Sequence, residues 1–418
     1  MFRGNPTRTF YGTGPLPKDS EVLWKTAGRF CGRSSVGGET KEWCGSGWTG
    51  QPVVWERPDG VTEVIFGAYD KAVHFYDAAT GEETRPPFKT GDIIKGSVTL
   101  DPDGYPLLYF GSRDNKLRIL ALDRKKPTEL WSLDANVVNG VWNNDWDGNP
   151  VIVDDVLYEG GENGWFFAIA LNRAYEDERV TVDPEIVFKM PGYDRALLDR
   201  VGRNVSIESS VAVFEDRVYF ANSGGRVLGV DVGSVRDGEA PVVFDYWVGD
   251  DVDASVVVDG EGMLYVASEF ERRTKQSKKL GQLVKLDPGK PDDPVVWGVD
   301  ARDGDQTAGI WATPALGDGV VYVTTHLGKL LAVDSEKGDV VWEADVGWHA
   351  WSSPVVVGKQ LLVATCGGKL RAYSLTKPTK PKASWSLQVS PSCIESTPAV
   401  WDGRLYVGSR DGRFYAVG

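Results

Sequence analysis

The chain has 418 residues, of which 25% are charged, and a formal net charge of −14 at pH 7. A surface of that sign repels phosphate groups, which argues against a nucleic-acid-binding protein. No apolar run approaches the roughly 18 residues that a membrane-spanning helix needs.

One pattern returns along the chain with a period of about 40 to 60 residues. It is clearest from Trp311 to Trp342: a small residue and proline, an apolar strand, a tight turn, Val-Val-Tyr-Val, a glycine turn, an apolar strand ending in Asp334, and Val-Val-Trp. Residues 352–385 repeat the pattern, and residues 395–417 repeat its first three strands. Repeats of this length and composition are typical of β-propeller blades.

The repeats predict seven complete, four-stranded antiparallel blades. They span residues 48–94, 95–140, 141–203, 204–252, 253–309, 310–350 and 351–392. Residues 393–418 supply only three strands, whereas residues 21–27 resemble an orphaned fourth strand. Joining these two segments removes an unpaired sheet edge. The sequence therefore predicts an all-β fold, a single eight-bladed β-propeller domain over residues 1–418, with the ring closed by strand 21–27.

Large aromatic residues recur in the outer strands. The tryptophans are Trp24, Trp131, Trp297, Trp342 and Trp385. The equivalent place is taken by Phe188 in one further blade and by Phe244 or Trp247 in another. A buried tryptophan removes roughly 150–250 Å² from water. We expect these side chains to pack between neighbouring blades and not to form a ligand cage.

Three segments look like the tryptophan-docking motif Ala-x-Asp-x-x-Thr-Gly-x-x-x-Trp: residues 76–84, 121–131 and 332–342. The chain thereby resembles the pyrroloquinoline-quinone-like propeller repeat family. That family includes quinoprotein dehydrogenases and the eight-bladed lipoprotein scaffold of the bacterial outer-membrane barrel-assembly machinery. The resemblance implies the architecture, but a shared fold does not carry one function across such a set.

In a four-stranded blade, the loop between blades and the loop joining the second and third strands lie on one face of the disc. The starts of the inner strands should therefore surround a funnel, the largest concave feature and the predicted ligand site. Its rim is acidic and rich in tryptophan. The rim residues are Trp48, Lys95, Trp142, Asn144, Asn204, Glu208, Asp253, Trp311, His349, Trp351 and Glu395. Glu208 and Glu395 lie four blades apart, which argues against a joint acid/base pair.

Asp145, Asp147 and Asn149 alternate as the oxygen ligands of calcium loops do, but the later bidentate glutamate is missing. They are a candidate calcium site, with an Asx-rich turn as the alternative. The family resemblance implies a second possibility, in which Asn204, Glu208 and Asp253 hold Ca²⁺ and Trp311 stacks on the quinone. The chain has no adjacent cysteines, which does not favour pyrroloquinoline quinone as a cofactor.

The four cysteines all fall on the funnel side. Pairing Cys31 with Cys44 and Cys366 with Cys393 is geometrically sensible, and free thiols are the alternative. Disulfides would place the protein in a periplasm or outside the cell. The first residues, Met1 to Pro6, carry no signal-peptide core, so we expect either a mature form without its leader or a cytoplasmic protein.

Together these features predict a monomeric, non-catalytic binding scaffold that presents the funnel to a protein partner or small ligand. One alternative is a quinone- or calcium-dependent oxidoreductase. Another is a glycan-binding or glycan-cleaving propeller that uses Trp48, Trp142, Trp311 and Trp351 as stacking surfaces.

Overall fold

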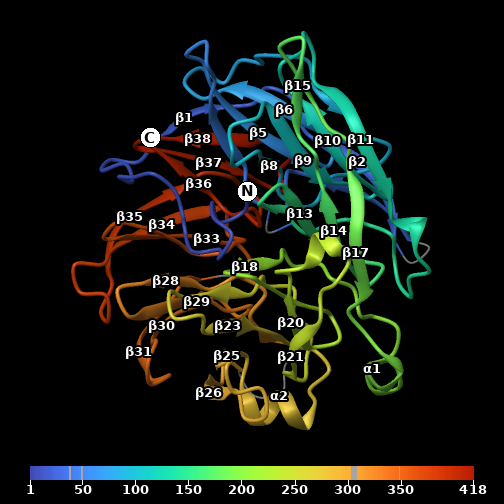
Figure 1. Ribbon diagram of the computed structural model, residues 1–418. Coiled ribbons are helices and arrows are strands. Elements are labelled where there is room, and N and C mark those ends of the chain that lie inside the picture. Colours follow the sequence, from blue (N-terminus) through green and yellow to red (C-terminus); the bar gives the residue numbers. More distant parts are fainter. Residues whose placement is uncertain (37–38, 49, 303–307, 348) are drawn as a thin grey trace.

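The computed structural model describes residues 1–36, 39–48, 50–302, 308–347 and 349–418. Eight four-stranded antiparallel sheets surround a central axis, and the N-terminus lies near that axis (Figure 1). The predicted all-β, eight-bladed propeller is confirmed. None of the helices in the described ranges is long and apolar enough to cross a membrane.

The first four blades, numbered in chain order, have the following strands. Blade 1 contains β4 (Val53–Glu56), β5 (Thr62–Ala68), β6 (Ala72–Asp77) and β7 (Phe88–Lys89). Blade 2 contains β8 (Thr99–Leu100), β9 (Leu107–Gly111), β10 (Lys116–Ala121) and β11 (Thr128–Asp134). Blade 3 contains β12 (Val151–Val153), β13 (Val156–Gly160), β14 (Trp165–Ala170) and β17 (Glu185–Pro191). Blade 4 contains β18 (Ala212–Phe214), β19 (Arg217–Ala221), β20 (Arg226–Asp231) and β21 (Val242–Trp247).

The other four blades follow the same order of strands. Blade 5 contains β22 (Val257–Val258), β23 (Leu264–Ala267), β25 (Leu283–Leu286) and β26 (Val295–Val299). Blade 6 contains β28 (Ala315–Gly317), β29 (Val320–Thr324), β30 (Lys329–Asp334) and β31 (Val340–Asp345). Blade 7 contains β32 (Val355–Val357), β33 (Gln360–Ala364), β34 (Lys369–Ser374) and β35 (Lys382–Gln388). Blade 8 contains β36 (Ala399–Trp401), β37 (Arg404–Gly408), β38 (Phe414–Val417) and β1 (Val22–Lys25).

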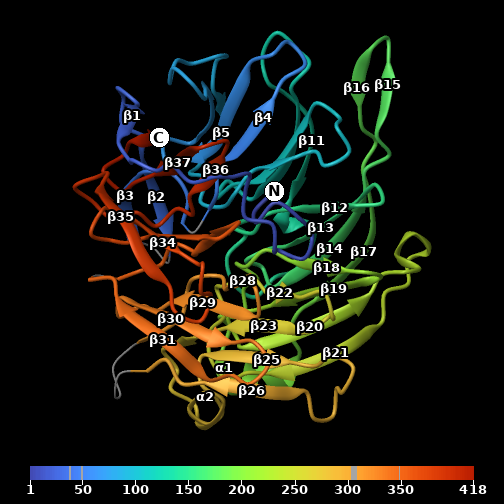
Figure 2. The same ribbon diagram turned by 90° about the vertical axis from the view of Figure 1, so that its left-hand side faces the viewer.

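Several short elements are inserted between these strands. They are the β2 (Cys31–Val36) and β3 (Glu39–Cys44) hairpin, the β15 (Ala174–Glu176) and β16 (Arg179–Thr181) hairpin, the β24 (Glu269–Phe270) and β27 (Ala308–Gly309) pair, α1 (Arg195–Val201), α2 (Lys275–Leu280), η1 (Ala135–Val137) and η2 (Val235–Asp237). The β15–β16 hairpin projects away from the rest of the ring (Figure 2).

The ring closes where the prediction placed the closure. β1 pairs antiparallel with β38, with Val22 opposite Val417 and Lys25 opposite Tyr415, and Figure 1 shows the blue strand beside the red one. Trp24 lies against Gly81 of blade 1 so closely that a Cβ at Gly81 would be 2.6 Å from the indole. Glycine is therefore required at Gly81 to let the tryptophan dock.

The docking aromatics occupy one position in seven blades. In each, the aromatic residue of the fourth strand directly follows a β-bulge in its pairing with the third strand. These residues are Trp24, Trp131, Phe188, Phe244, Trp297, Trp342 and Trp385. Phe244, and not Trp247, is thus the equivalent residue in blade 4. A bulge increases the local twist of the strand, which turns the aromatic ring toward the next blade.

A belt of side-chain hydrogen bonds joins the inner strands. The backbone N–H of Gln51 donates to the Ser97 hydroxyl at 2.8 Å, and the N–H of Ser255 donates to the Thr313 hydroxyl at 3.0 Å. Four more bonds of this kind link Asn149 to Ser210, Ser210 to Ser255, Thr313 to Ser353, and Ser353 to Thr397. The small residue before the proline in the repeat therefore has a structural role: it ties each blade to a neighbour.

Residues 1–16 plug the channel, which the sequence analysis did not predict. Arg3 donates from Nη1 to the Pro354 carbonyl at 2.7 Å and from Nη2 to the Thr313 carbonyl at 2.5 Å. Arg8 donates from Nε to the Val211 carbonyl at 2.8 Å. Both arginines are fully buried, and burial lowers the pKa of Arg3 to about 10 and that of Arg8 to about 9. Both side chains are therefore still cationic at neutral pH.

Candidate functional site

One backbone hydrogen bond recurs in all eight blades and defines a face of the propeller. A residue in each connection between the second and third strands donates its N–H to a carbonyl in the loop that precedes the inner strand, at 2.8–3.0 Å. We call the donors the turn residues: Tyr69, Arg113, Glu162, Ser223, Glu269, His326, Cys366 and Arg410. The accepting carbonyls belong to Gly45, Ile93, Asp145, Ser206, Asp251, Gly309, His349 and Cys393. The two kinds of loop thus lie on the same face, which we call the mouth.

A second ring of side chains follows from the same spacing. Two residues after each accepting carbonyl stand Gly47, Lys95, Asp147, Glu208, Asp253, Trp311, Trp351 and Glu395. In blades 2 to 8, a member of the hydrogen-bond belt follows two residues later. Six of the predicted rim residues belong to this ring, and Trp48 directly follows its member in blade 1. The repeat therefore fixes the depth of each side chain in the channel.

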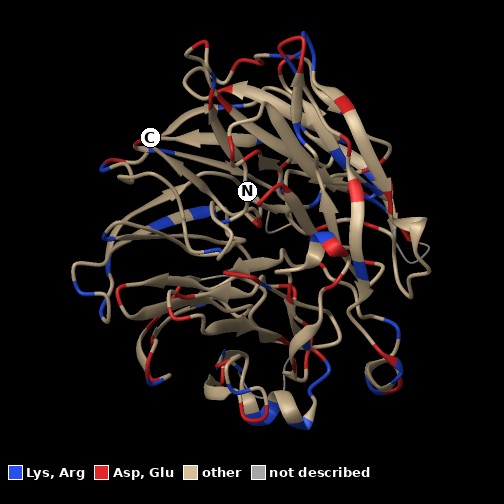
Figure 3. Cartoon of the chain, viewed as in Figure 1, with Lys and Arg blue, Asp and Glu red and all other residues tan. Residues whose placement is uncertain are grey.

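The mouth is chemically divided into two arcs. The acidic arc, in blades 3 to 5, comprises Asp145, Asp147, Glu162, Glu208, Asp251, Asp253 and Glu269. The aromatic arc comprises Trp48, Trp311, His326, His349 and Trp351. Figure 3 shows acidic segments near the centre of the ring as well as on outer loops.

In blade 3 the acidic arc is paired with cations. One carboxylate oxygen each from Asp145, Asp147 and Glu162 lie within 4.8 Å of one another. The Lys95 ammonium contacts Asp147 and lies 3.5 Å from Glu162, and Arg113 Nε lies 2.5 Å from Asp145. Burial alone would lower the pKa of Lys95, but Asp147, Glu162 and Glu208 raise it well above its usual value. Lys95 is therefore a permanent cation at the mouth.

The predicted calcium ligands are only partly brought together. Asp145 and Asp147 lie in this cluster, but the third carboxylate is Glu162, which sequence reasoning missed. Asn149 belongs to the plug instead: its Oδ1 accepts a hydrogen bond from Phe2 N at 2.6 Å and from Arg8 Nη1 at 3.2 Å. Because Lys95 and Arg113 already neutralise the three carboxylates, the cluster does not offer a free cation site, and calcium binding there stays a prediction.

In blades 4 and 5, Asp251 is the one carboxylate of the arc that has an ion pair within the described ranges. Glu208 and Asp253 form no ion pair within the described ranges, and Asp251 Oδ1 is buried without a hydrogen-bond partner. Ser206 donates a hydrogen bond to Glu208 at 2.8 Å, and Arg272 lies 3.4 Å from Asp251 Oδ2. Burial, followed by the neighbouring carboxylates, raises the pKa of Glu208 and of Asp253 to about 7. Burial raises the pKa of Asp251 to about 8, against the opposing effect of Arg272.

The aromatic arc is held together by ring contacts and hydrogen bonds. The Trp351 ring centroid lies 5.4 Å from that of Trp48 and 5.2 Å from that of Trp311. Trp351 Nε1 donates to His326 Nδ1 at 2.9 Å, and the rings of His326 and His349 stack at 4.3 Å. Burial, and then His349, lowers the pKa of His326 to about 4. His326 is thus neutral, as its role as hydrogen-bond acceptor requires.

A small cavity of about 10 Å³, with room for at most one water, lies between the acidic arc and the plug. Its walls include Trp48, Asp147, Glu208 and Asp253, and Phe2 of the plug also lines it. Ser97, Ser209, Ser210 and Ser255 add hydroxyl or backbone groups from the loops below the arc. The cavity thus joins Trp48, at one end of the aromatic arc, to three carboxylates.

Three predicted rim residues belong neither to the ring of side chains nor to either arc: Trp142, Asn144 and Asn204. Trp142 has 46% of its surface exposed. Asn144 donates to Asn136 Oδ1 at 2.8 Å, and Asn204 Oδ1 accepts from Ser206 at 3.2 Å. Trp142 and Asn144 belong to the loop between blades 2 and 3 and mark the outer rim of the mouth.

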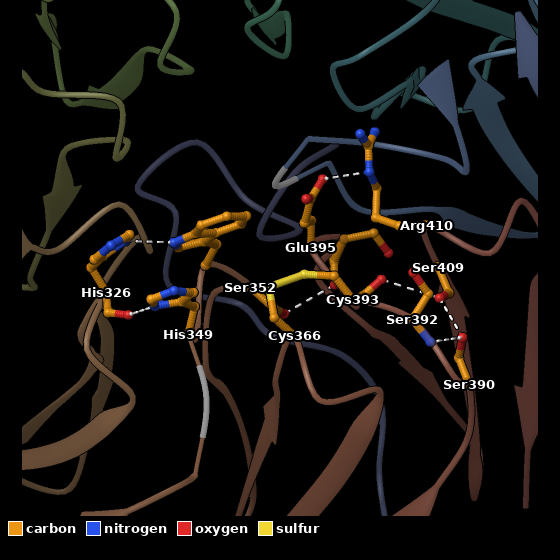
Figure 4. Close-up of a disulfide and its surroundings, with 12 residues drawn as sticks. His326, His349, Ser352, Cys366, Ser390, Ser392, Cys393, Glu395, Ser409 and Arg410 are labelled. Carbon is orange, nitrogen blue, oxygen red and sulfur yellow. Dashed lines mark hydrogen bonds and ion pairs between the residues drawn. A yellow bond between two sulfur atoms is a disulfide. The ribbon is translucent and has the colours of Figure 1, made fainter. Parts of the chain in front are cut away.

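Both predicted disulfides are present, Cys31–Cys44 and Cys366–Cys393. Cys366 is a turn residue, and its N–H donates to the His349 carbonyl. Figure 4 shows the bond to Cys393 between the His326–His349 pair and the Glu395–Arg410 ion pair, whose atoms lie 3.5 Å apart. The disulfide therefore links blades 7 and 8 at the mouth.

The other disulfide closes the β2–β3 hairpin, which reaches the mouth beside blade 1. Trp43 of β3 lies between two turn residues, with the Arg113 guanidinium 5.4 Å and the Arg410 guanidinium 5.1 Å from its ring. Sequence reasoning missed both arginines and Trp43. The turn residues could have been found by aligning the repeats, because each follows the second strand of its blade by one or two residues.

Comparison with known proteins agrees with the repeat pattern. Residues 279–418 match the family model described as outer membrane protein assembly factor BamB. A stretch of 101 residues is 32% identical to BamB of Yersinia pestis, covering 23% of this chain and 25% of that protein. A stretch of 136 residues is 29% identical to the quinohemoprotein alcohol dehydrogenase ADH IIB of Pseudomonas putida, covering 28% of this chain and 18% of that protein. The chain is thus similar to pyrroloquinoline-quinone-like (PQQ-like) propellers.

The matched stretches cover only a quarter or less of the length of these curated relatives. Solved structures support the architecture over most of the chain. BamB from Moraxella catarrhalis superposes with a TM-score of 0.58 at 16% identity, covering 87% of this chain and 96% of that one. The computationally designed Ika8 protein superposes with a TM-score of 0.62 at 10% identity, covering 89% and 96%. At these identities the likeness concerns the fold alone.

The residues at the mouth of this PQQ-like propeller do not fit a bound quinone. The cavity beside Glu208 and Asp253 measures about 10 Å³, far below the roughly 300–1,000 Å³ of pockets that hold drug-sized ligands. The mouth disulfide joins two blades and does not cap a ring from adjacent cysteines. Trp311, the expected stacking plate, meets the His326 ring edge-on with centroids 3.8 Å apart.

Proposed function

We propose that this PQQ-like propeller is a binding scaffold and that its mouth face receives a protein partner. The observation that carries the proposal is the eightfold frame. One repeated backbone hydrogen bond holds eight turn residues of six different types: two Arg, two Glu, and one each of Tyr, Ser, His and Cys. The frame fixes where the side chains stand and leaves their chemistry free to match a partner.

Two further observations support the proposal. Trp142 and Val137, each 46% exposed, lie on the outer rim of the mouth, and exposed aromatic residues are enriched among the anchors of protein interfaces. Two of the curated relatives are named outer membrane protein assembly factors. The two disulfides support an oxidising compartment, a periplasm or the outside of the cell, as the place of action.

The proposal is tested by affinity capture from extracts of cells that produce the protein, with captured proteins quantified by mass spectrometry. Trp142→Ala removes an exposed aromatic side chain at the mouth. Tyr175→Ala is the matched control, because Tyr175 is 55% exposed on the β15–β16 hairpin, which connects a third strand to a fourth and so lies on the opposite face.

The expected result is a partner whose capture falls at least about fivefold with Trp142→Ala, the effect of an interface residue worth over 1 kcal/mol, and is retained with Tyr175→Ala. A partner that is lost with Tyr175→Ala and kept with Trp142→Ala would place the interface on the opposite face and refute the proposal. Thermal melting of both variants verifies that they are folded.

A further inference from the structure

We propose that the propeller has a second binding site, on the face opposite the mouth, which takes a small organic anion: a single carboxylate attached to an aromatic or alicyclic ring. A cavity of about 770 Å³ lies there, within the roughly 300–1,000 Å³ of pockets that hold drug-sized ligands. The inference goes beyond the proposed function, because the site lies on the other face of the disc and its ligand is not a protein.

The walls of this cavity come from loops of three neighbouring blades. Blade 1 contributes the β4–β5 turn and the connection from β6 to β7, and blade 2 contributes the β8–β9 and β10–β11 turns. Tyr175 of the β15–β16 hairpin of blade 3 also lines the cavity. These connections join a first strand to a second or a third strand to a fourth, so they lie on the face that the turn residues do not occupy.

Part of the wall is apolar and suited to a ring. Its members are Trp55, Pro58, Pro106, Leu122 and Tyr175. The ring of Tyr105 stacks on that of Tyr175 with centroids 5.4 Å apart, and the Arg173 guanidinium lies 4.9 Å from the Tyr105 ring. These contacts hold the hairpin side of the wall in place. Aromatic and proline rings offer large apolar contact surface to a ring-shaped ligand.

Arg85 provides a fixed cation in the wall. Its side chain is 9% exposed, its Nε donates to the buried carboxylate of Glu63 at 2.9 Å, and its Nη1 donates to the Leu122 carbonyl at 2.9 Å. The guanidinium lies 5.7 Å from the Trp55 ring. Nη2 has no partner within the described ranges. Arg85 is thus held by other residues of the chain and keeps N–H donors for a ligand, as a preorganised binding group does.

The carboxylates of the two turns that line the cavity are already occupied. Arg57 and the backbone N–H of Val61 donate to Asp59. Arg124 donates to one oxygen of Asp123, and the Val180 N–H donates to the other at 2.8 Å. Each of these carboxylates is therefore paired with a cation and needs no donor from a ligand.

Lys125 is the cation that this pairing leaves over. It is exposed next to Arg124, and in the part of the chain that the structure describes it has no ion pair. Glu56, exposed at the end of β4, is the lining carboxylate without an ion pair there. The free groups are therefore N–H donors from two cations, Lys125 and Arg85, against one carboxylate. This set favours an acceptor with a single negative charge, because Glu56 would repel a polyanion.

The test is calorimetric titration of the whole protein with indole-3-acetate and with 2-naphthoate, two ring carboxylates. Indole-3-acetamide keeps the ring without the charge, and acetate keeps the charge without the ring, so both serve as comparison titrants at the same salt concentration. The site variants are Lys125→Gln and Arg85→Met. The matched control is Lys126→Gln, because Lys126 is the next residue, is also exposed and does not line the cavity.

We expect both ring carboxylates to bind, and indole-3-acetamide and acetate to bind at least about tenfold more weakly, since one lacks the charge-assisted hydrogen bonds and the other lacks the apolar contact. Lys125→Gln should weaken binding about two- to fivefold, as loss of an exposed charge does, and Lys126→Gln should leave it unchanged. Arg85→Met should weaken binding at least about tenfold. Arg85→Met also removes a partner of Glu63, so thermal melting verifies its fold, and the comparison of Lys125→Gln with Lys126→Gln decides the question if that variant is unfolded.

Three results would overturn the proposal. Equal affinity for indole-3-acetate and indole-3-acetamide would show an apolar cavity without an anion site. Equal weakening by Lys125→Gln and Lys126→Gln would show diffuse electrostatic attraction. Binding of neither ring carboxylate would show that the cavity does not take this class of ligand. None of these results bears on the mouth, whose partner is tested by Trp142→Ala.

Discussion

Buried charges at the two ends of the central channel differ in whether they have hydrogen-bond or ion-pair partners. At the plug end, Arg3 and Arg8 are fully buried, and each guanidinium donates to backbone carbonyls of the inner strands. At the mouth end, Glu208 and Asp253 are also buried but form no ion pair within the described ranges, and their pKa values are raised to about 7. The same eight blades surround both sets of charges.

The difference separates a structural role from a binding role. A buried charge whose hydrogen bonds are satisfied stabilises the fold, and removing it leaves the facing groups unsatisfied. A buried charge that lacks partners destabilises the folded state, and groups with strongly shifted pKa values cluster at functional sites. Substitution of the buried charged residues at the plug end should therefore lower stability. Substitution of those at the mouth end should weaken binding and can raise stability.

Arg8→Ala should produce the largest loss of stability. The substitution removes bonds from Arg8 to the carbonyls of Phe2, Asn149 and Val211 and leaves a cavity in the channel. We expect the free energy of unfolding to fall by about 3–5 kcal/mol, as measured by chemical denaturation at pH 7. Arg195→Ala is the control, because Arg195 is 86% exposed and pairs with Asp199 at the surface. Its removal should cost less than about 0.5 kcal/mol, and equal effects of the two substitutions would contradict a structural plug.

Removal of the mouth disulfide by Cys366→Ala with Cys393→Ala should have the next largest effect. The bond closes a loop with a sequence separation of 27 and links blades 7 and 8, on the face that has no plug. A loop of this length predicts a loss of about 2–4 kcal/mol, measured by thermal and chemical unfolding.

The hairpin disulfide is the comparison for that prediction. Cys31 and Cys44 have a sequence separation of 13 and join two strands that already pair with each other. The double variant Cys31→Ala with Cys44→Ala should therefore lose less stability than the blade-linking variant. A larger loss from the hairpin bond would show that closure of the mouth depends on the β2–β3 hairpin.

The repeats made the fold predictable from the sequence. Most blades share the order of small residue, apolar strand, glycine turn and outer aromatic, so eight blades and the closing strand could be placed without coordinates. Phe188 and Phe244 could be aligned with Trp297 for the same reason, and in the structure a bulge directly precedes each of the three. Both disulfides followed from the face on which their loops lie.

The plug and the pairing of charges at the mouth could not be predicted in that way. Residues 1–16 have no repeat to align with, and the burial of Arg3 and Arg8 depends on carbonyls contributed by distant blades. Asn149 fitted a calcium-ligand spacing, yet its side chain holds the plug because Phe2 and Arg8 reach it across the channel. Contacts between the N-terminal segment and blades 3, 4, 6 and 7 leave no local pattern in the sequence.

Glu208→Gln should change the free energy of unfolding least among these variants, and it should increase stability where the others decrease it. Burial raises the pKa of Glu208 from its usual 4.5 to about 7, so the folded state binds a proton that the unfolded state has released. The stability contributed by this proton is fully present below about pH 4.5 and is lost as the pH rises through about 7. Glutamine keeps the shape and carries no charge, so the variant should be more stable than the wild type by about 1–3 kcal/mol at pH 8.5, with the gain vanishing near pH 4.5.

His326, whose pKa is lowered to about 4, makes the wild type gain stability between about pH 4 and 6.5, but it is present in both proteins and its effect disappears from the difference. The measurement is the free energy of unfolding of both proteins from pH 4.5 to 8.5, with Glu215→Gln on the exposed opposite face as the control. A difference that stays constant over this range would mean that Glu208 is already neutralised by a partner in the folded protein, and the contrast between the two ends of the channel would then not hold at this residue.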